Sequence, residues 1–478
     1  MISITRKAKS GSRSRFKSRR QPRDTLSIHY YIRHMADLRR ELSLFDMTMI
    51  AIGSSIGSGI FLTPALIAKA LPSPAWIIGI WTVGGITTMC GALTYAELGG
   101  MMPRAGGVYN FLSEAYGGLT GFLYGWAYFL VVNTGALAAL AVAFSTYLGF
   151  FFPFAGTHTL LVGILGIVFV TIINVLGVKA GGVFSDLFTV LKVAGIIGLI
   201  VVGLGWGSSS TTNFASPLGP LPGGLASALT LSFVSILWSF GGWQHATFTS
   251  AEAKNPRRTV PLSLIFGALA VTLIYVSTNV AYMFLMSPEQ MAGSPTLAAD
   301  AIGRVLGPVG GSVIAVVIFI STFGTTGIYT LTAPRIYFAM ARDGLFFKKV
   351  ADVHPRFRTP MFAIILQSSW AIVLLLFWGT FESLISYVVF TDWIFFALAA
   401  FSIFIFRRRS ADADRPYRTL GYPLTPALFV LISTLFVCYT LFEKPAESIA
   451  GLCFLVLGVP VYMFWTHRKT HEAALKND

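Results

Sequence analysis

Apolar residues run along this chain in long, nearly unbroken stretches joined by short polar connectors, without the alternation that marks a half-buried strand. A helix needs roughly 20 such residues to cross a hydrocarbon core. Twelve stretches approach or exceed that length, and they cover residues 44–70, 75–100, 116–150, 158–178, 183–206, 223–251, 259–286, 304–341, 359–379, 381–406, 421–442 and 447–465. The pattern therefore predicts an all-α membrane protein with twelve transmembrane helices.

Composition agrees with this pattern and divides the chain into three parts. Hydrophobic residues make up 55% of the chain and charged residues only 12%, with a mean hydropathy of +0.71, outside the balance of soluble proteins. We expect one transmembrane domain over residues 41–466. Residues 1–40 are expected to form a basic, disordered cytoplasmic tail, although their start also resembles a transit peptide, and residues 467–478 a second cytoplasmic tail.

The net charge of +15 reports topology. When the connectors alternate between the two sides of a membrane, Lys69, Arg304 and Lys444 fall on one side and Lys192 lies inside a stretch. All other Lys and Arg residues fall on the opposite side with both termini, so the positive-inside rule predicts cytoplasmic ends. We expect a multi-pass protein of a plasma or bacterial inner membrane that contacts anionic lipid, with no nucleic-acid partner.

The cysteines give no sign of a metal centre or a cofactor. Cys90, Cys438 and Cys453 lie in apolar stretches and show no metal-ligand spacing. We interpret them as small packing residues, and we expect neither metal nor cofactor.

The first apolar stretch contains "AIGSSIGSGIF", residues 51–61, which permits three interpretations. Gly53, Ser55 and Gly57 match the pattern of a hydrolase nucleophile, but that needs a preceding strand and His and acidic partners, and the flanks here are apolar for a full span. Gly53 and Gly57 also fit a helix-packing face, which leaves Ser58 and Gly59 unexplained. The third interpretation is a break in the helix at residues 57–59, because glycine and serine weaken helix propensity in succession.

A break of this kind provides a binding site for a charged ligand. Free backbone N–H groups at the start of the second half-helix bind a carboxylate, aided by the positive end of the helix dipole. The sixth stretch contains "SFGGWQ", residues 239–244, and a second break there offers carbonyl groups to an ammonium. Two interrupted helices at corresponding places five helices apart indicate an inverted-repeat transporter with its site at the bilayer midplane, here a site for a zwitterion.

Charged residues within spans are costly unless they are paired or face water. Lys192 lies at about mid-depth, where we expect a functional ammonium that substitutes for a sodium ion or titrates. Asp392 also lies deep within its apolar stretch. Two roles are possible for its side chain, a structural hydrogen bond between helices and the handling of a proton. Glu97 and Glu252 lie near cytoplasmic ends, where contacts that anchor a gate or a loop are expected.

Several longer segments resemble one family. "IGSGIFLTP", "YAELGGMMPRAGGVYNFLSEAYG", "FGGWQHATFTSAEAKNPRRTVP" and "IYVSTNVAY" are similar to the amino acid, polyamine and organocation (APC) superfamily, and most to its L-type amino acid transporter branch and prokaryotic relatives. The resemblance implies two inverted five-helix repeats, about residues 44–206 and 223–406, with discontinuous helices 1 and 6. Two peripheral helices follow, about residues 421–465, and transport proceeds by alternating access.

The resemblance also implies site residues. Those expected to bind substrate are Ser55, Ile56, Gly57, Ser58, Gly59, Phe240, Gly241, Gly242 and Tyr282. In this assignment the amides of the first break hold the carboxylate, and the carbonyls of Ile56 and Phe240 receive the amino group. Trp238 matches the gating aromatic on the extracellular side. Lys192, with Ser321 as its neighbour, occupies the place of a sodium ion in related transporters.

The predicted function is sodium-independent amino acid transport, and not an enzymatic activity. Ser55 replaces a residue that is usually apolar, which favours small or medium neutral substrates over large apolar ones. Exchange and proton symport are both open, as is the oligomeric state. The connector "GFFFPFAGTHT", residues 149–159, lacks the cysteine that bonds a heavy-chain partner in animal relatives, so no such partner is implied. A carrier of cationic amino acids or polyamines and an amino-acid sensor that does not transport are the alternatives.

Overall fold

The computed structural model describes residues 38–206, 214, 221, 224–377, 381–443 and 445–474, with side chains at all of these except 381–389, 446–447 and 471–474. Residues 1–37, which make up most of the predicted N-terminal tail, lie outside the described part. The last four residues of the chain, which belong to the predicted C-terminal tail, lie outside it as well.

Helices account for nearly all of the secondary structure in this part of the chain. Before residue 207 they are α2 (Leu44–Ser55), α3 (Gly59–Ala70), α4 (Pro74–Met101), α5 (Val108–Tyr116), α6 (Gly118–Ala127), the π-helical turn η1 (Tyr128–Val132), α7 (Asn133–Gly149), α8 (Pro153–Thr157), α9 (Thr159–Val175) and α10 (Val178–Trp206). After residue 223 they are α11 (Gly224–Phe240), α12 (His245–Phe248), η3 (Ser250–Glu252), α13 (Pro256–Leu285), α14 (Pro288–Gly293), α15 (Leu297–Leu306), α16 (Pro308–Thr332), α17 (Pro334–Arg342), η4 (Lys348–Ala351), α18 (Met361–Phe377), α19 (Phe381–Arg409), α20 (Leu424–Glu443) and α21 (Pro445–Ala474).

Local sequence signals explain several of these helix starts. Ser43 and Asp46 form reciprocal side-chain-to-backbone hydrogen bonds that cap the start of α2. Proline begins α4, α13 and α16. An N–H at the first position of a helix has no acceptor within the helix, so proline, which lacks this group, loses no hydrogen bond there. These four helices therefore start where a first amide is capped or absent.

The prediction of an all-helical membrane protein is confirmed. Nine described segments are long and apolar enough to span a membrane: Leu44–Ala70, Pro74–Met101, Gly118–Gly149, Val178–Trp206, Pro256–Leu285, Pro308–Arg342, Phe390–Arg409, Leu424–Glu443 and Ser448–Thr470. Three shorter apolar helices, α9, α11 and α18, coincide with the remaining predicted stretches. Large apolar side chains stand exposed on the outside of α9, α10, α20 and α21, as expected of surfaces that face lipid.

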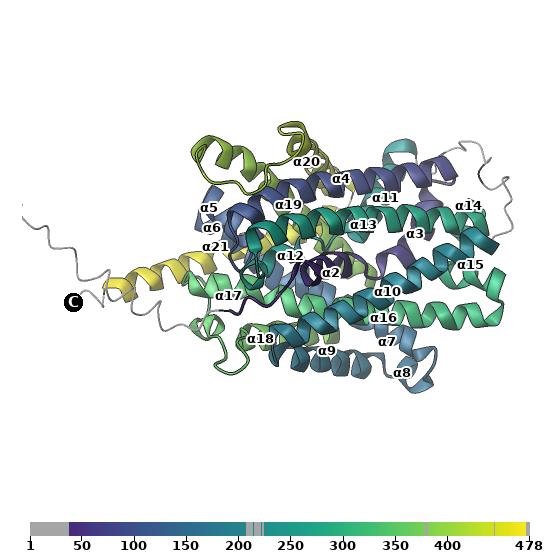
Figure 1. Cartoon of the computed structure of the whole chain (residues 1–478), viewed down its shortest axis with the longest axis horizontal. Coiled ribbons are helices and arrows are strands. Elements are labelled where there is room, and N and C mark those ends of the chain that lie inside the picture. Colours follow the sequence, from purple (N-terminus) through teal and green to yellow (C-terminus); the bar gives the residue numbers. More distant parts are fainter. Residues whose placement is uncertain are drawn as a thin grey trace, which may run out of the picture. The chain divides into compact units, whose positions relative to one another are not determined.

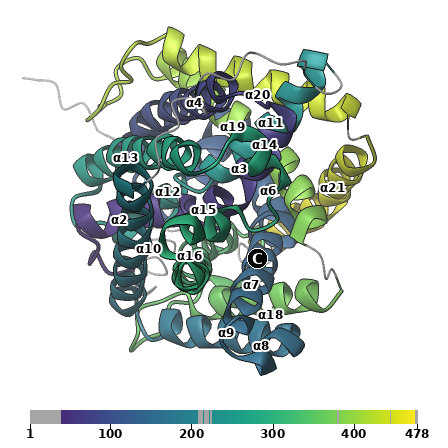
Figure 2. The same cartoon turned by 90° about the vertical axis from the view of Figure 1, so that its right-hand side faces the viewer.

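The interrupted segment α2–α3 lies inside the bundle. In its most apolar window 78% of the residues are buried, against 28% for α20 and 17% for the window Ser448–Thr470 in α21. Packing contacts join α13 to α4 and α2, and join α16 to α10 and α7. Figures 1 and 2 show α20 and α21 at the edge of the bundle, as the predicted peripheral helices would be. The interior position of α2–α3 places its break at the centre of the packed helices.

Candidate functional site

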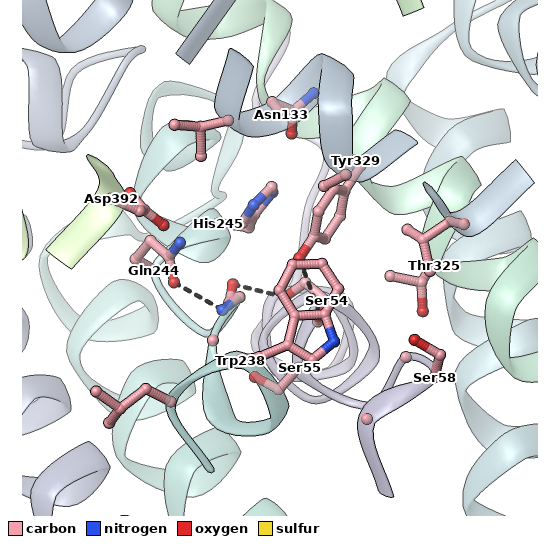
Figure 3. A pocket seen from close by; sticks show the side chains of 18 of the residues that line it. Ser54, Ser55, Ser58, Asn133, Trp238, Gln244, His245, Thr325, Tyr329 and Asp392 are labelled. Atoms are coloured by element: carbon pink, nitrogen blue, oxygen red, sulfur yellow. Dashed lines mark hydrogen bonds between the residues drawn. The ribbon is translucent and has the colours of Figure 1, made fainter. Parts of the chain in front are cut away.

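A cavity of about 50 Å³ lies where the two interrupted helices meet. Five parts of the chain line it: the α2–α3 junction, the η1–α7 segment, the α11–α12 junction, α16 and α19. Figure 3 shows the polar side chains around it, from Ser54, Ser55, Ser58, Asn133, Gln244, His245, Thr325, Tyr329 and Asp392, together with the ring of Trp238. Such a volume holds a few water molecules or a small polar ligand.

The first break leaves amide groups free at the start of α3. Helix α2 ends at Ser55 and α3 begins at Gly59, and the amide of Gly57 donates to the carbonyl of Ser55 over 3.0 Å. No hydrogen bond between described residues uses the amides of Ser58, Gly59 or Ile60. These are the first donors of a helix, which lack an intrahelical acceptor. They suit a carboxylate, because the positive end of the helix dipole lies at the same place.

The second break touches the first. Between α11 and α12 the chain turns at Gly242, whose φ of +111° belongs to the region that favours glycine. The hydroxyl of Ser54 donates to the carbonyl of Gly242 over 2.8 Å, and the amide of Gly242 donates to Oε1 of Gln244 over 3.0 Å. Figure 3 shows this chain of hydrogen bonds continuing from Ser54 to Tyr329. The two breaks therefore form one connected site.

Tyr275 on α13 joins the same two breaks, and the sequence did not single it out. Its hydroxyl donates to the carbonyl of Ser55 and to the carbonyl of Ser239, each over 2.9 Å. Tyr282, the predicted site tyrosine, is buried but does not line the cavity, and its hydroxyl has no hydrogen-bond partner among the described residues. The two tyrosines are seven residues apart, two helical turns, so they share a face and the pattern could not tell which one reaches the breaks.

Lys192 is fully buried on α10 and binds the end of α2. Its Nζ donates to the carbonyls of Gly53 and Ile56, over 2.9 and 2.8 Å, and to the hydroxyl of Thr325 over 2.7 Å. Carbonyls at a helix C-terminus carry partial negative charge, which an ammonium stabilises. The direct side-chain partner of Lys192 is thus Thr325 on α16. The predicted neighbour, Ser321, donates instead to the carbonyls of Ile56 and Gly57, over 3.1 and 2.9 Å.

These contacts affect the carbonyls assigned to the substrate ammonium. The carbonyl of Ile56 already accepts from Lys192, Ser321 and Thr325. The carbonyl of Phe240 accepts no hydrogen bond from a described residue, while the Phe240 ring packs against Trp81 and Tyr275. Of the two predicted acceptors, Phe240 is therefore the one with free capacity in this conformation.

Several polar residues line the cavity that the sequence did not assign to it. His245 is fixed on both sides, with Nδ1 2.5 Å from the hydroxyl of Thr332 and Nε2 3.0 Å from the hydroxyl of Tyr128. Asn133 is completely buried, and neither atom of its side-chain amide has a partner among the described residues. The sequence signal for Asn133 was a lone asparagine in the apolar run "YFLVVNTGALAAL". In the structure a π-helical turn precedes it, a feature often found at functional sites.

Of the acidic residues Asp392 and Glu252, one lines the cavity and the other does not. Asp392 on α19 lines it, and its Oδ1 has no partner among the described residues. Glu252 does not line it, because both of its oxygens accept from the guanidinium of Arg335, over 2.7 and 2.8 Å, and both side chains are fully buried. The backbone around Glu252 also pairs with Leu42. The amide of Leu42 donates to the carbonyl of Glu252, and the carbonyl of Leu42 accepts from the amide of Lys254.

Glu97 also lies outside the cavity. It accepts from Arg407 and Arg415 and from the amide of Thr419, which anchors the connector after α19 to α4. Within the described part of the chain, no group of three or more His, Cys, Asp or Glu residues is placed to hold a metal ion.

The sequence of this chain is similar to known proteins over nearly its whole length. Residues 42–465 match a sequence family described as "Amino acid permease". The chain is 31% identical to the serine/threonine exchanger SteT of Bacillus subtilis, over 90% of this chain and 98% of that protein. It is 30% identical to the human b(0,+)-type amino acid transporter 1, over 94% of this chain and 93% of the relative. It is also 30% identical to the human cystine/glutamate transporter, over 89% and 85%.

Proposed function

Because the chain belongs to the amino acid permease family of membrane transporters, which are not enzymes, we propose that it moves small neutral amino acids across the membrane without sodium. The observation that carries the proposal is the meeting of two helix breaks at one small polar cavity. Free amides at the start of α3 would hold the substrate carboxylate, and the carbonyl of Phe240 its ammonium. Trp238, which lines the cavity, would close it toward the outside.

The proposed membrane fold has twelve spans. Two inverted five-helix repeats, about residues 44–206 and 223–406, would each begin with an interrupted helix, and α20 and α21 would be peripheral. Three observations support this arrangement: the nine long apolar segments, the three shorter ones and the low burial of α20 and α21. With an even number of spans, and with the basic connectors on one side, both termini would lie in the cytoplasm.

Two observations favour a small substrate. The cavity is only about 50 Å³ and its wall carries hydroxyl and amide groups, which suits a short polar side chain. A relative is described as a serine/threonine exchanger, and we propose serine, threonine and alanine as the substrate class of this chain as well. Lys192 supports sodium independence, because its ammonium already occupies the carbonyls between α2 and α16 that would otherwise be open to a cation.

A second candidate function rests on Asp392. A carboxylate in the cavity wall, without an ion pair to any described residue, would suit the positively charged side chain of a cationic amino acid. The same carboxylate could carry a proton in symport. The neutral assignment is preferred because a long cationic side chain needs more room than this cavity offers.

Counterflow into proteoliposomes tests the function. With threonine inside, labelled threonine and serine are expected to accumulate at the same rate in sodium and in choline medium, and lysine is expected not to compete. Uptake that requires internal amino acid indicates exchange, whereas uptake into empty vesicles driven by a proton gradient indicates symport. Binding without any uptake would leave only a sensor. Competition by lysine or ornithine instead of serine would favour the cationic alternative.

Asn133 provides a test of the proposed substrate class. Threonine and valine are nearly equal in size and differ by a hydroxyl, which the unpaired amide of Asn133 is placed to bind. Asn133→Ala is expected to weaken competition by threonine relative to valine, so that the ratio of the threonine inhibition constant to the valine inhibition constant rises roughly tenfold, the magnitude of one buried hydrogen bond.

The matched control is Asn174→Ala, because Asn174 is equally buried but lies outside the cavity and donates to backbone carbonyls. The control is expected to keep the wild-type ratio. An unchanged ratio in Asn133→Ala would remove this residue from substrate recognition.

A further inference from the structure

A groove of about 460 Å³ opens on the outside of the bundle, far from the central cavity. It lies between the start of α18, the end of α21 and the η4 turn. Figure 1 shows α17, α18 and the C-terminal part of α21 at the same end of the bundle. Its wall contains Phe362 and Leu366 of α18, Trp465 of α21 and the Phe347–Val350 segment. The proposed transport cycle makes no use of this groove.

The groove has an apolar end and a basic end. Phe362, Leu366 and Trp465 lie within the apolar stretches 359–379 and 447–465, so they belong to the hydrocarbon region. Arg468 lies three residues beyond the end of stretch 447–465, and Lys348 and Lys349 lie in the connector between stretches 304–341 and 359–379, where lipid head groups are expected. Aromatic residues at such a boundary are typical of the membrane interface. The polarity of the groove thus follows the membrane normal.

The walls of the groove are held in place by contacts between distant segments. The rings of Phe347 and Trp465 pack edge to face with their centroids 5.2 Å apart. Nζ of Lys469 donates to the carbonyl of Asp343 over 2.8 Å, which ties the end of α21 to the loop after α17. Arg468 stacks over the Trp465 ring, with Cζ 5.7 Å from its centroid. A groove fixed in this way binds a ligand at a lower entropic cost than a mobile surface does.

We propose that this groove binds one anionic phospholipid, with an acyl chain along α18 and the phosphate among Lys348, Lys349 and Arg468. The three cations match a head group with a net negative charge, whereas a zwitterionic head group would bring an ammonium beside them. The apolar end of the groove would hold an acyl chain, which a free phosphate lacks. The groove volume is also within the range of ordinary ligand pockets, about 300–1,000 Å³.

The test measures lipid retention on the purified wild-type protein. Delipidated protein is titrated with dioleoylphosphatidylglycerol or dioleoylphosphatidylcholine, and bound lipid is counted by native mass spectrometry and by the shift in melting temperature. One site with at least a tenfold preference for phosphatidylglycerol is expected. The triple variant K348Q/K349Q/R468Q is expected to lose this preference, because each cation near an anionic head group strengthens binding severalfold.

Two further variants keep the result interpretable. The control K179Q/R408Q/R418Q removes the same charge from exposed positions on the connectors predicted to share this membrane face, and it is expected to retain the site. Leu366→Trp fills the apolar end without changing any charge and is expected to release the lipid. Equal binding of the two lipids, loss of preference in the control to the same extent, or retention in both groove variants would overturn the proposal. Glycerol phosphate is expected not to compete.

Discussion

Gly242→Ala is expected to lower uptake about 100-fold, whereas Gly198→Ala on α10, outside the cavity, is expected to retain it. A Cβ at position 242 would collide with the backbone of the first break, at 2.6 Å from the carbonyl carbon of Ser54 and 2.9 Å from the amide nitrogen of Ser55. Backbone atoms cannot rotate away as a side chain can, and the φ of +111° adds strain for any residue with a Cβ. The two breaks would be forced apart, and displacing groups that position a ligand by about 1 Å costs roughly 100-fold.

Gly198→Ala is the matched control for this experiment. A Cβ at Gly198 would meet no atom within 4 Å, its φ is not positive, and this residue does not line the cavity. Counterflow of labelled threonine measures both variants, and size-exclusion profiles and melting temperatures check that they fold. Wild-type uptake by Gly242→Ala would show that the contact between the breaks is not needed for transport.

Lys192→Met is expected to abolish sodium-independent uptake while leaving the melting temperature unchanged or higher. The ammonium connects α10 to the end of α2 and to α16, so its removal disconnects the first break from both. Replacing a buried charge by an apolar side chain of similar length is often neutral or stabilising. The carbonyl of Ile56 keeps Ser321 as a donor, and the hydroxyl of Thr325, 3.0 Å from the carbonyl of Gly53, can turn to that one.

The control for this variant lies on the same helix. Lys179→Met removes an exposed ammonium near the start of α10 and is expected to keep full uptake. Uptake by each variant is compared in sodium and in choline medium. Strict sodium dependence of the wild type, or undiminished uptake by Lys192→Met, would contradict the assigned role. A large drop in melting temperature would show instead that Lys192 serves mainly to stabilise the fold.

The helical segments and the breaks were predictable because the membrane imposes them. Length and apolarity alone define a span, and three small residues in succession at the centre of a span weaken the helix there. The sequence could not rank those glycines. A Cβ at Gly57 would make only ordinary contacts, the nearest at 3.7 Å to Leu140, whereas one at Gly59 would come within 2.8 Å of the Cα of Ser239. That distinction depends on which helix lies opposite each residue.

The polar partners in the site were the part that the sequence could not supply. Tyr275 and Tyr282 share a helix face, and only the position of the breaks along α13 selects Tyr275. Asn133 is one polar residue in an apolar run, and its meaning depends on which side of α7 faces the cavity. Glu252 and Arg335 are 83 residues apart, and their pairing follows from the packing of α17 beside the loop after α12. Each of these contacts is set by tertiary structure.

The pairing of Leu42 with the loop after α12 has a mechanical consequence. Two backbone hydrogen bonds, of 2.9 and 2.8 Å, join Leu42 to Glu252 and Lys254, and Glu252 is in turn held by Arg335. Leu42, which leads directly into α2, is therefore also tied to the segment after α12 and, through Glu252, to Arg335 of α17. Leu42 and the segment after the half-helix α12 would have to move together whenever this end of the bundle opens.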